Sequence, residues 1–335
     1  MSGELYLRHM LKSLSCKLTA KSFLWPLFIV SFLLLLLILY YCTQIEISHN
    51  LDGLQSGPNS DHPCATHSAA FQDHFVVPNH VHFVHFNTPN FSFVSFVCIA
   101  SALINHRPER VIIHTNVNTT ELDQDRFVRV LRRNFPLTVE FRTTRRPTHV
   151  FGVRLGSAFH ATDVYRLHVA VKEGGIFLDQ DTFVVQSLDP LRYYPAVVGW
   201  PEGQFVGTQA LFFEPQSYFG RVWLESYRDY RPSLWYYNSG ELLTTTVLRQ
   251  CPDLVHREPV LLGVQGLAHE LYEMMWDQWR KYYTVHLLFR HREYLTPGDQ
   301  NQSGIMEFDE VNVWNYNHTF GAMARQVLSN IQDFP

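Results

Sequence analysis

The sequence predicts an α/β domain, in which a mostly parallel sheet is flanked by helices, preceded by a single transmembrane helix. First, short apolar runs with strand periodicity alternate with helical patterns from Asn79 onward, as in proteins with parallel sheets. Second, Phe23–Cys42 is an uncharged apolar run of about twenty residues, which as a helix would span the hydrocarbon core of a bilayer. At 335 residues and 46% hydrophobic content, the chain can bury one large core or two modest ones.

Basic residues indicate the orientation of the apolar run. Those that precede it are Arg8, Lys12, Lys17 and Lys21. No Lys or Arg follows until Arg107, and this asymmetry places the short N-terminus in the cytosol. We therefore expect a cytosolic tail over 1–21, a signal anchor over 22–42, a lumenal stem over 43–78 and a catalytic domain over 79–335. A cleaved signal peptide is the alternative, but the run is long for one and no small-x-small cleavage site follows it.

Five segments in the first half of the globular region are expected to be regular. They are a strand at His80–Phe86, a helix at Phe91–Asn105, a strand at Arg110–Asn116, a helix at Leu122–Asn134 and a strand at Leu137–Arg142. The first segment alternates histidines with apolar residues, which is the period of a half-buried strand. Zinc binding by His74, His80, His82 and His85 is the alternative, but no Cys or further His pattern supports it.

Two carboxylates follow the next short apolar run. Ile176–Leu178 is expected to be a buried strand, and Asp179 and Asp181 come directly after it. Alternate residues of an extended chain point the same way, so the two carboxylates can face one small volume. They repel each other unless a cation lies between them, and Mg²⁺ or Mn²⁺ suits such oxygen ligands. A solvated turn is the structural alternative for an isolated Asp-x-Asp.

The segment before this strand, 161–171, has helical periodicity. Its expected apolar stripe consists of Val164, Leu167, His168 and Val171. Asp163 and Arg166 lie one turn apart on another face, where an exposed ion pair is the structural alternative to a function. Gly174 and Gly175 then permit a tight turn and a close approach of the backbone.

The combined pattern resembles a known family. Thr162-Asp163-x-x-Arg166, followed by Glu173-Gly174-Gly175-Ile176-Phe177-Leu178-Asp179-Gln180-Asp181, is similar to the sugar-binding region containing the DXD motif in a family of retaining glycosyltransferases. That family includes animal α1,4-galactosyltransferases and α1,4-N-acetylglucosaminyltransferases and the yeast α1,6-mannosyltransferase. The resemblance covers roughly residues 79–325 and is strongest over 157–190.

The resemblance implies a GT-A fold and a Golgi type II membrane enzyme. Such an enzyme would transfer a hexosyl or N-acetylhexosaminyl group from a UDP-sugar to a glycolipid or glycan, with retention and thus an α-linkage. It would use Mn²⁺ or Mg²⁺ and be anchored in the lipid bilayer. The net charge of −4 gives no indication of a nucleic-acid partner.

The resemblance also implies roles for individual residues. Asp181 would ligate the metal, which neutralises the departing UDP diphosphate, and Asp179 would hold the metal or the ribose. Asp163 would accept hydrogen bonds from hydroxyls of the donor sugar, and Arg166 would donate to sugar or phosphate oxygens.

Thr208–Glu214 is similar to a family strand that lines the sugar pocket. Gln209 is therefore a catalytic candidate beside Asp179 and Asp181, and Glu214 is its alternative on the reacting face. Attack by the acceptor on the face from which UDP leaves is equally open.

Two later elements carry further candidates. Trp235–Thr244 resembles a Gly-Pro-x-Leu-Leu-Thr element, with Glu241 where Pro is usual, and its aromatic rings either pack the core or stack on pyranose rings. Val311–Asn315 resembles a Val-His-x-Trp-Asn element, in which Asn312 replaces a histidine that is a plausible third metal contact. A carboxamide binds Mn²⁺ more weakly than an imidazole does. In all, the donor-binding candidates are Asp163, Arg166, Gly174, Gly175, Asp179, Gln209, Gly240 and Trp314.

Cysteines and sequons fit a secretory-pathway protein. Of Cys64, Cys98 and Cys251, at least one must be free or bonded to another chain. We expect Cys64, in the stem, to form an intermolecular bridge in a homodimer, and Cys98 to be a buried small hydrophobe. The candidate glycosylation sites are Asn90, Asn118, Asn301 and Asn317.

Two other functions are alternatives to the transferase. A phosphatase with an aspartate nucleophile has an Asp-x-Asp-x-Thr signature, but it needs a downstream Lys, for which Lys281 alone is available. A non-catalytic, membrane-anchored carbohydrate-binding protein is suggested by Asn312 and Glu241. It would bind UDP without turnover, or not at all.

Overall fold

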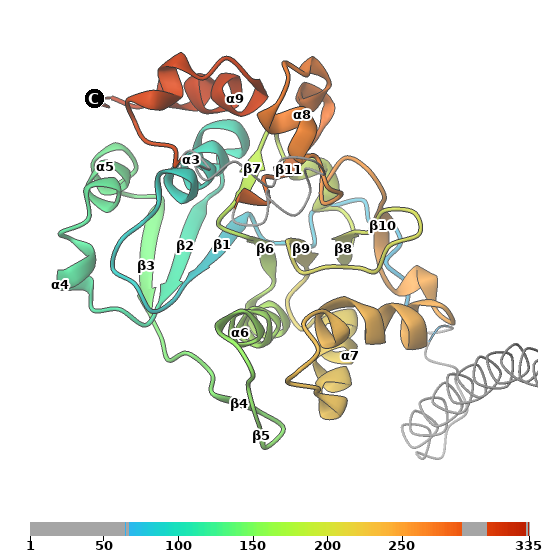
Figure 1. Cartoon of the computed structure of the whole chain (residues 1–335). Helices are drawn as coiled ribbons and strands as arrows, with labels where there is room; N and C mark the ends of the chain where they lie inside the picture. Colours follow the sequence, from blue (N-terminus) through green and yellow to red (C-terminus); the bar gives the residue numbers. More distant parts are fainter. Residues whose placement is uncertain (1–63, 65–66, 290–306, 333, 335) are drawn as a thin grey trace, which may run out of the picture. The chain divides into compact units, whose positions relative to one another are not determined.

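The computed structural model describes residues 64, 67–289, 307–332 and 334 (Figure 1). All of these residues belong to one compact unit of the chain. Within the described part, no helix is long and apolar enough to cross a membrane. The expected signal anchor, 22–42, and the sequon at Asn301 lie outside the described residues.

A seven-stranded sheet forms the centre of the fold, in the order β10-β8-β9-β6-β1-β2-β3. Parallel pairs join β6 to β1, β1 to β2, β2 to β3 and β8 to β10. Only β9 runs antiparallel to both of its neighbours, β6 and β8. The expectation of an α/β domain with a mostly parallel sheet is thereby confirmed.

The described strands have the following bounds. They are β1 His80–His85, β2 Arg110–Thr115, β3 Val139–Thr143, β4 His149–Val150, β5 Val153–Arg154, β6 Gly175–Leu178, β7 Thr182–Val184, β8 Ala196–Gly199, β9 Ala210–Phe213, β10 His256–Glu258 and β11 Thr284–His286. Outside the large sheet, β7 pairs with β11 and β4 pairs with β5, each in antiparallel fashion.

The described helices and helical turns lie between these strands and after them. They are α3 Phe93–Ser101, η2 Ala102–His106, α4 Thr119–Leu122, α5 Arg126–Asn134, α6 Ala158–Glu173, η3 Asp189–Leu191, α7 Tyr218–Ser226, η4 Tyr227–Asp229, η5 Tyr237–Glu241, η6 Thr244–Leu248, η7 Pro252–Leu254, α8 Ala268–Tyr272, η8 Asp277–Lys281, η10 Asn312–Asn315 and α9 Thr319–Leu328.

Helices cover both faces of the sheet (Figure 1). The apolar sides of α3, α5 and α9 pack with one face of the central strands in one hydrophobic cluster. A second cluster on the opposite face unites α6 and α7 with side chains from β6, β8 and β9. The two clusters hold the strand ends in fixed positions, and these ends carry the site described below.

Short polar side chains fix where the helices begin. Ser157 accepts a hydrogen bond from the backbone N–H of His160 at the start of α6, and Asp125 accepts one from Val128 at the start of α5. Gly174 ends α6 with a φ of 67°, a conformation that side chains with a Cβ rarely adopt. A Cβ there would also lie 2.7 Å from the carbonyl oxygen of Phe213.

The observed burial of histidines in β1 and α6 differs from two expectations. β1 was expected to be half-buried, but His82 and His85 are both buried, because β1 is a central strand with helices over both faces. In α6, His168 is exposed and does not belong to the apolar stripe, whereas Arg166 is buried. The helix therefore buries a charged residue on the side that faces the strand ends.

Of the two expectations about cysteines, the one for Cys98 is confirmed and the one for Cys64 is wrong. Cys64 forms a disulfide with Cys251 of the same chain, so the expected intermolecular bridge through Cys64 is wrong. Cys98 is free and buried in α3, as expected. Near Cys64, the backbone N–H groups of Ala69 and Gln72 donate to the carbonyls of Asp253 and Tyr193, so this segment of the predicted stem lies against the domain.

Candidate functional site

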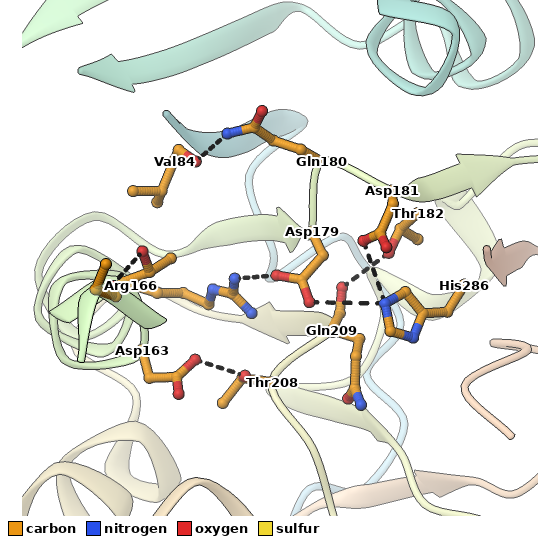
Figure 2. A network of polar contacts seen from close by, with 12 residues as sticks. Val84, Asp163, Arg166, Asp179, Gln180, Asp181, Thr182, Thr208, Gln209 and His286 are labelled. Atoms are coloured by element: carbon orange, nitrogen blue, oxygen red, sulfur yellow. Dashed lines mark hydrogen bonds and ion pairs between the residues drawn. The ribbon is translucent and has the colours of Figure 1, made fainter. Parts of the chain in front are cut away.

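Three potential metal ligands meet at the end of β6. Asp179 and Asp181 follow that strand, and His286 is the last residue of β11. One ligand atom from each residue lies within 4.8 Å of the others. β11 brings His286 there because it pairs with β7, which begins directly after Asp181, and His286 lies opposite Thr182 in that pair. Figure 2 shows the imidazole facing both carboxylates.

Positive charge surrounds the two aspartates. Arg166, only 2% exposed, forms an ion pair with Oδ1 of Asp179. Nε2 of His286 lies 3.2 Å from Oδ1 of Asp181 and 3.9 Å from Oδ2 of Asp179. Asp179 thus uses one oxygen toward Arg166 and turns the other toward the cluster (Figure 2).

The pKa values follow from this pairing. Burial opposes ionisation of Asp181, but the neighbouring His286 outweighs it and lowers the pKa of Asp181. Burial also opposes protonation of His286, yet the charge and hydrogen bond of Asp181 raise the pKa of His286. A proton on the imidazole therefore supplies the cation that two close carboxylates require.

The donor set fits a divalent cation. Two carboxylates and one imidazole are ligands that Mn²⁺ accepts, and the imidazole makes the set less suited to Mg²⁺, which prefers oxygen. A bound metal would take the place of the proton on Nε2 of His286 and leave positions for phosphate oxygens. In the part of the chain that the structure describes, no second cluster of three such ligands exists, so the zinc alternative for His74, His80, His82 and His85 is not supported.

Backbone hydrogen bonds hold the loop that carries the aspartates. The backbone N–H of Asp179 donates to the carbonyl of Gln209 at 3.0 Å, and that of Leu287 donates to the carbonyl of Asp181 at 2.8 Å. Between the aspartates, Oε1 of Gln180 lies 3.0 Å from Nδ1 of His85, and its amide donates to the carbonyl of Val84 (Figure 2). The loop is thereby tied to β1, β9 and β11 at once.

The aspartates and His286 lie in a cavity of about 530 Å³. Arg166 and Asp163 from α6, with Gln209 and Thr208 before β9, complete its floor. The hydroxyl of Thr208 donates to Asp163 at 2.8 Å, and burial raises the pKa of Asp163. The polar loop between β1 and α3 also lines the cavity, and so do aromatic side chains from the start of α6 and from the segment before η5.

The structure gathers five of the predicted site residues around this cavity: Asp163, Arg166, Asp179, Asp181 and Gln209. Gln209 belongs there because β9 is antiparallel to β6, so the residue before β9 lies beside the residue after β6. Glu214, its alternative, follows β9 and lies at the other end of that strand pair. Oε1 of Gln209 is buried and accepts no hydrogen bond from a described residue.

Four other predicted donor-binding residues are not among the described residues that line the cavity: Gly174, Gly175, Gly240 and Trp314. Gly174 precedes β6 and Gly175 begins it, whereas the aspartates follow it, so the length of the strand separates the two glycines from the cluster. Gly175 lets the ring of His82 approach, since a Cβ would lie 2.7 Å from its Nε2. Gly240 likewise permits close packing, because a Cβ would lie 2.3 Å from the carbonyl oxygen of Val206.

Asn312 is engaged in a local turn rather than in the cluster. Its amide donates to the carbonyl of Glu307 at 2.8 Å, and its Oδ1 accepts from the backbone N–H of Asp309 at 3.0 Å. The third place beside the two aspartates is taken by His286, which was missed at the level of sequence. The available signal was a histidine in the short apolar run 284–287, but only its pairing with β7 brings it to the site.

A family model matches residues 95–197, and its description is a glycosyltransferase sugar-binding region containing the DXD motif. The resemblance expected from the sequence is thereby confirmed. Glucan organizing enzyme 1 of Cryptococcus neoformans var. grubii is 28% identical over 180 residues, which are 48% of this chain and 46% of that protein. The match therefore spans less than half of that relative's length.

Solved structures also match the chain. The glycosyltransferase GlyE of Streptococcus pneumoniae is 11% identical, with 77% of this chain and 65% of that chain covered and a TM-score of 0.42. The galactosyltransferase LgtC, in complex with donor and acceptor sugar analogues, is 12% identical, with 76% of this chain and 97% of that chain covered and a TM-score of 0.38.

Proposed function

We propose that this protein is a metal-dependent retaining glycosyltransferase of the GT-A type, which transfers a hexosyl or N-acetylhexosaminyl group from a UDP-sugar to a glycolipid or glycan. The observation that carries the proposal is the Asp179–Asp181–His286 cluster at the end of a sheet strand, open to a cavity large enough for a small ligand. The match to the DXD sugar-binding region agrees with it.

The cluster suits the departure of a diphosphate. Asp179, Asp181 and His286 would hold Mn²⁺, which when bound neutralises the charge that develops on the departing UDP. Arg166 is buried against Asp179, so it holds that carboxylate in a fixed orientation. Asp163, held by Thr208, would accept hydrogen bonds from hydroxyls of the donor sugar.

The carboxylates that line the described cavity favour attack on the face from which UDP leaves. They are Asp163, Asp179 and Asp181, and each is already paired, with Thr208, Arg166 and His286 respectively. None is left as a nucleophile for a covalent intermediate. In the proposed step, the bond between the anomeric carbon and the UDP oxygen breaks and a bond to the acceptor oxygen forms. The hydroxyl proton passes to the departing diphosphate, and the amide of Gln209 lies beside the reacting face.

The cellular setting remains part of the proposal. The uncharged run 22–42 and the basic residues before it support a type II signal anchor, and therefore a Golgi enzyme with its site in the lumen. Asn90, Asn118 and Asn317 are exposed, as glycosylated asparagines in that compartment would need to be.

The two rival functions lose support at the site. Asn312 motivated the non-catalytic alternative, yet His286 offers a ligand atom beside the two aspartates, where Asn312 was expected. The phosphatase needs a lysine at the nucleophile, and Lys281 lies in η8, outside the described lining of the cavity.

The proposal is tested with the full-length chain purified in detergent. UDP is titrated by calorimetry with and without Mn²⁺, and release of UDP is then followed for a panel of UDP-sugars. We expect Mn²⁺-dependent binding of UDP and turnover of one donor, both lost in Asp181→Ala. The matched control is Asp189→Ala, which removes a carboxylate that pairs with Arg192 outside the cavity. Absence of UDP binding with every metal tried would contradict the proposal.

A further inference from the structure

The part of the cavity lining that comes from the start of α6 and the segment before η5 carries two large exposed rings. Phe159 is the second residue of α6, and Trp235 precedes η5. The rings meet edge to face with centroids 4.9 Å apart, and both line the cavity. Trp235 is 53% exposed and Phe159 is 45% exposed. Exposed apolar rings at the mouth of a polar cavity mark a binding surface. We call this pair the aromatic rim.

The aromatic rim is held in place from behind. Nδ1 of the buried His160 lies 2.5 Å from the hydroxyl of Tyr230, which itself accepts from the backbone N–H of Gly156. Nε2 of His160 lies 3.1 Å from the backbone carbonyl of Trp235. Because a carbonyl only accepts, Nε2 carries the proton and Nδ1 accepts from the tyrosine hydroxyl. A rim fixed in this way loses little conformational entropy when a ligand binds.

One face of α6 leads from the rim to the candidate metal centre. Phe159 and Asp163 are four residues apart and Arg166 follows three residues later, so the three side chains share a helix face. Arg166 reaches Asp179, and Asp163 reaches Thr208. In Figure 2, Asp163 and Thr208 lie on the side of Asp179 away from Val84 and Gln180. The rim therefore continues the cavity beyond the predicted position of the donor sugar.

Another part of the cavity lining, the loop after β1, is the better place for a nucleoside. This loop lies at the carboxyl ends of parallel strands, where nucleotides bind in open α/β sheets. Its cavity-lining side chains include Asn87, Thr88 and Ser92, which offer hydrogen bonds to a base and a ribose. A donor with its base there and its diphosphate at the aspartates would direct its sugar toward the rim.

On the basis of the proposed function, we propose that the aromatic rim is the acceptor subsite and that it binds a pyranose ring. The C–H face of a pyranose is flat and apolar, and it stacks on aromatic rings, while its hydroxyls remain at the edge. The acceptor is thus a saccharide whose terminal sugar stacks on Trp235 and Phe159 and presents a hydroxyl toward Asp163. His160 is a positioning residue, since it acts through the backbone of Trp235.

The test measures binding to the full-length chain loaded with Mn²⁺ and UDP. Methyl β-lactoside, methyl β-glucoside and methyl α-mannoside are the probes, followed by saturation-transfer NMR and calorimetry. We expect at least one glycoside to bind, and Trp235→Leu and Phe159→Leu each to weaken its affinity about tenfold or more, with UDP affinity unchanged. The matched control is Phe71→Leu, which removes a ring that is 59% exposed and stacks on Tyr193 at 5.0 Å outside the cavity lining.

Two variants of the positioning residue sharpen the test. His160→Gln can still donate to the carbonyl of Trp235, so glycoside affinity should be largely retained, whereas His160→Ala should lower it. Retained UDP binding shows in every variant that the fold and the metal centre are intact. The inference is overturned if no glycoside binds the wild-type protein, or if the rim variants bind it normally. A loss of UDP affinity in Trp235→Leu would instead assign the rim to the base. Absence of UDP binding to the wild-type protein would contradict the proposed function itself.

Discussion

At the scale of single residues, Gln180 shows how a side chain between two ligands can set their geometry. Its amide contacts Nδ1 of His85 and the carbonyl of Val84, so the loop that carries Asp179 and Asp181 is fastened to the end of β1. A site for a metal requires that its ligands be held before the ion arrives.

Replacement of this amide should loosen the metal site more than the fold. We expect Gln180→Leu to weaken Mn²⁺ affinity about tenfold and to lower the free energy of unfolding by about 1–2 kcal/mol, because two hydrogen bonds are lost. Calorimetric titration with Mn²⁺ and chemical denaturation measure the two effects. Gln186→Leu is the control, since its amide also donates to backbone carbonyls, those of Lys281 and Tyr282, outside the cavity lining. Equal Mn²⁺ affinity of the two variants would contradict a positioning role for Gln180.

His286 should decide which metal the site prefers. His286→Asn replaces an imidazole by a carboxamide, so we expect Mn²⁺ affinity to fall by about tenfold or more while Mg²⁺ affinity changes less. Electron paramagnetic resonance of free Mn²⁺, with Mg²⁺ as competitor, measures both. His256→Asn, on the edge strand β10, serves as the control. An unchanged ratio of the two affinities would show that His286 is not a ligand.

At the scale of elements, the central strands and the helix beside them bury several histidines. His82 in β1 bonds to His114 in β2, and His114 bonds in turn to Tyr165 in α6. His106 ends η2, where its Nδ1 accepts the backbone N–H of Leu188 at 3.2 Å. Burial lowers the pKa of His106 to about 4 and that of His114 to about 4. These histidines are therefore neutral in the folded protein at neutral pH.

Acid should destabilise the fold through these residues. The unfolded chain binds protons on its histidines near pH 6.5, whereas folded His106 stays neutral until about pH 4, so stability falls as the pH drops through this window. We expect His106→Asn, which keeps an acceptor for the backbone N–H of Leu188, to lose less stability in acid than the wild-type protein does. The difference in the free energy of unfolding should be on the order of 3 kcal/mol at most. Urea unfolding at several pH values between 7 and 4 measures the slope. A slope equal to that of the wild-type protein would contradict the assignment.

At the scale of the whole molecule, one covalent bond joins the first described residue of the domain to a residue that follows most of its sheet. Cys64 and Cys251 are separated by 187 residues, and the disulfide closes a loop that contains most of the sheet. Cross-links over long loops restrict the unfolded chain most strongly. Beyond Cys64, the backbone N–H groups of Ala69 and Gln72 add hydrogen bonds to the carbonyls of Asp253 and Tyr193.

Removal of this bond should lower stability without changing the site. We expect Cys64→Ser to reduce the free energy of unfolding by about 2–5 kcal/mol, because the unfolded chain regains its freedom. Thermal unfolding with and without a reductant measures the effect. A reductant should destabilise the wild-type protein and leave Cys64→Ser unchanged. If both respond equally to the reductant, the disulfide between Cys64 and Cys251 is not the cause.

The features that could be predicted from the sequence are those that depend on residues close together in the chain. The strands β1, β2, β3 and β6 were expected within two residues of their bounds, because each has a clear apolar pattern bounded by turns. Asp163, Arg166 and Asp179 were found because each lies close in sequence to a well-marked helix or strand. His286 was missed because it reaches the site through the pairing of two strands of three residues, which no local pattern announces. Asn312 was chosen from its place in a short element, whereas its side chain is used within its own turn.

The origin of His286 on a strand far along the chain has a consequence for biosynthesis. Asp179 and Asp181 emerge from the ribosome long before β11, so a nascent chain holds two of the three ligands and lacks the third. A cation that needs all three ligands binds only the completed fold. At a free concentration one hundred times its dissociation constant, it adds about 2.7 kcal/mol to the free energy of unfolding. Metal ions in the compartment where the chain folds would then stabilise completed chains and leave incomplete chains without this stabilisation. Protease resistance conferred by Mn²⁺ on full-length protein, but not on a chain that ends before β11, would demonstrate this selection.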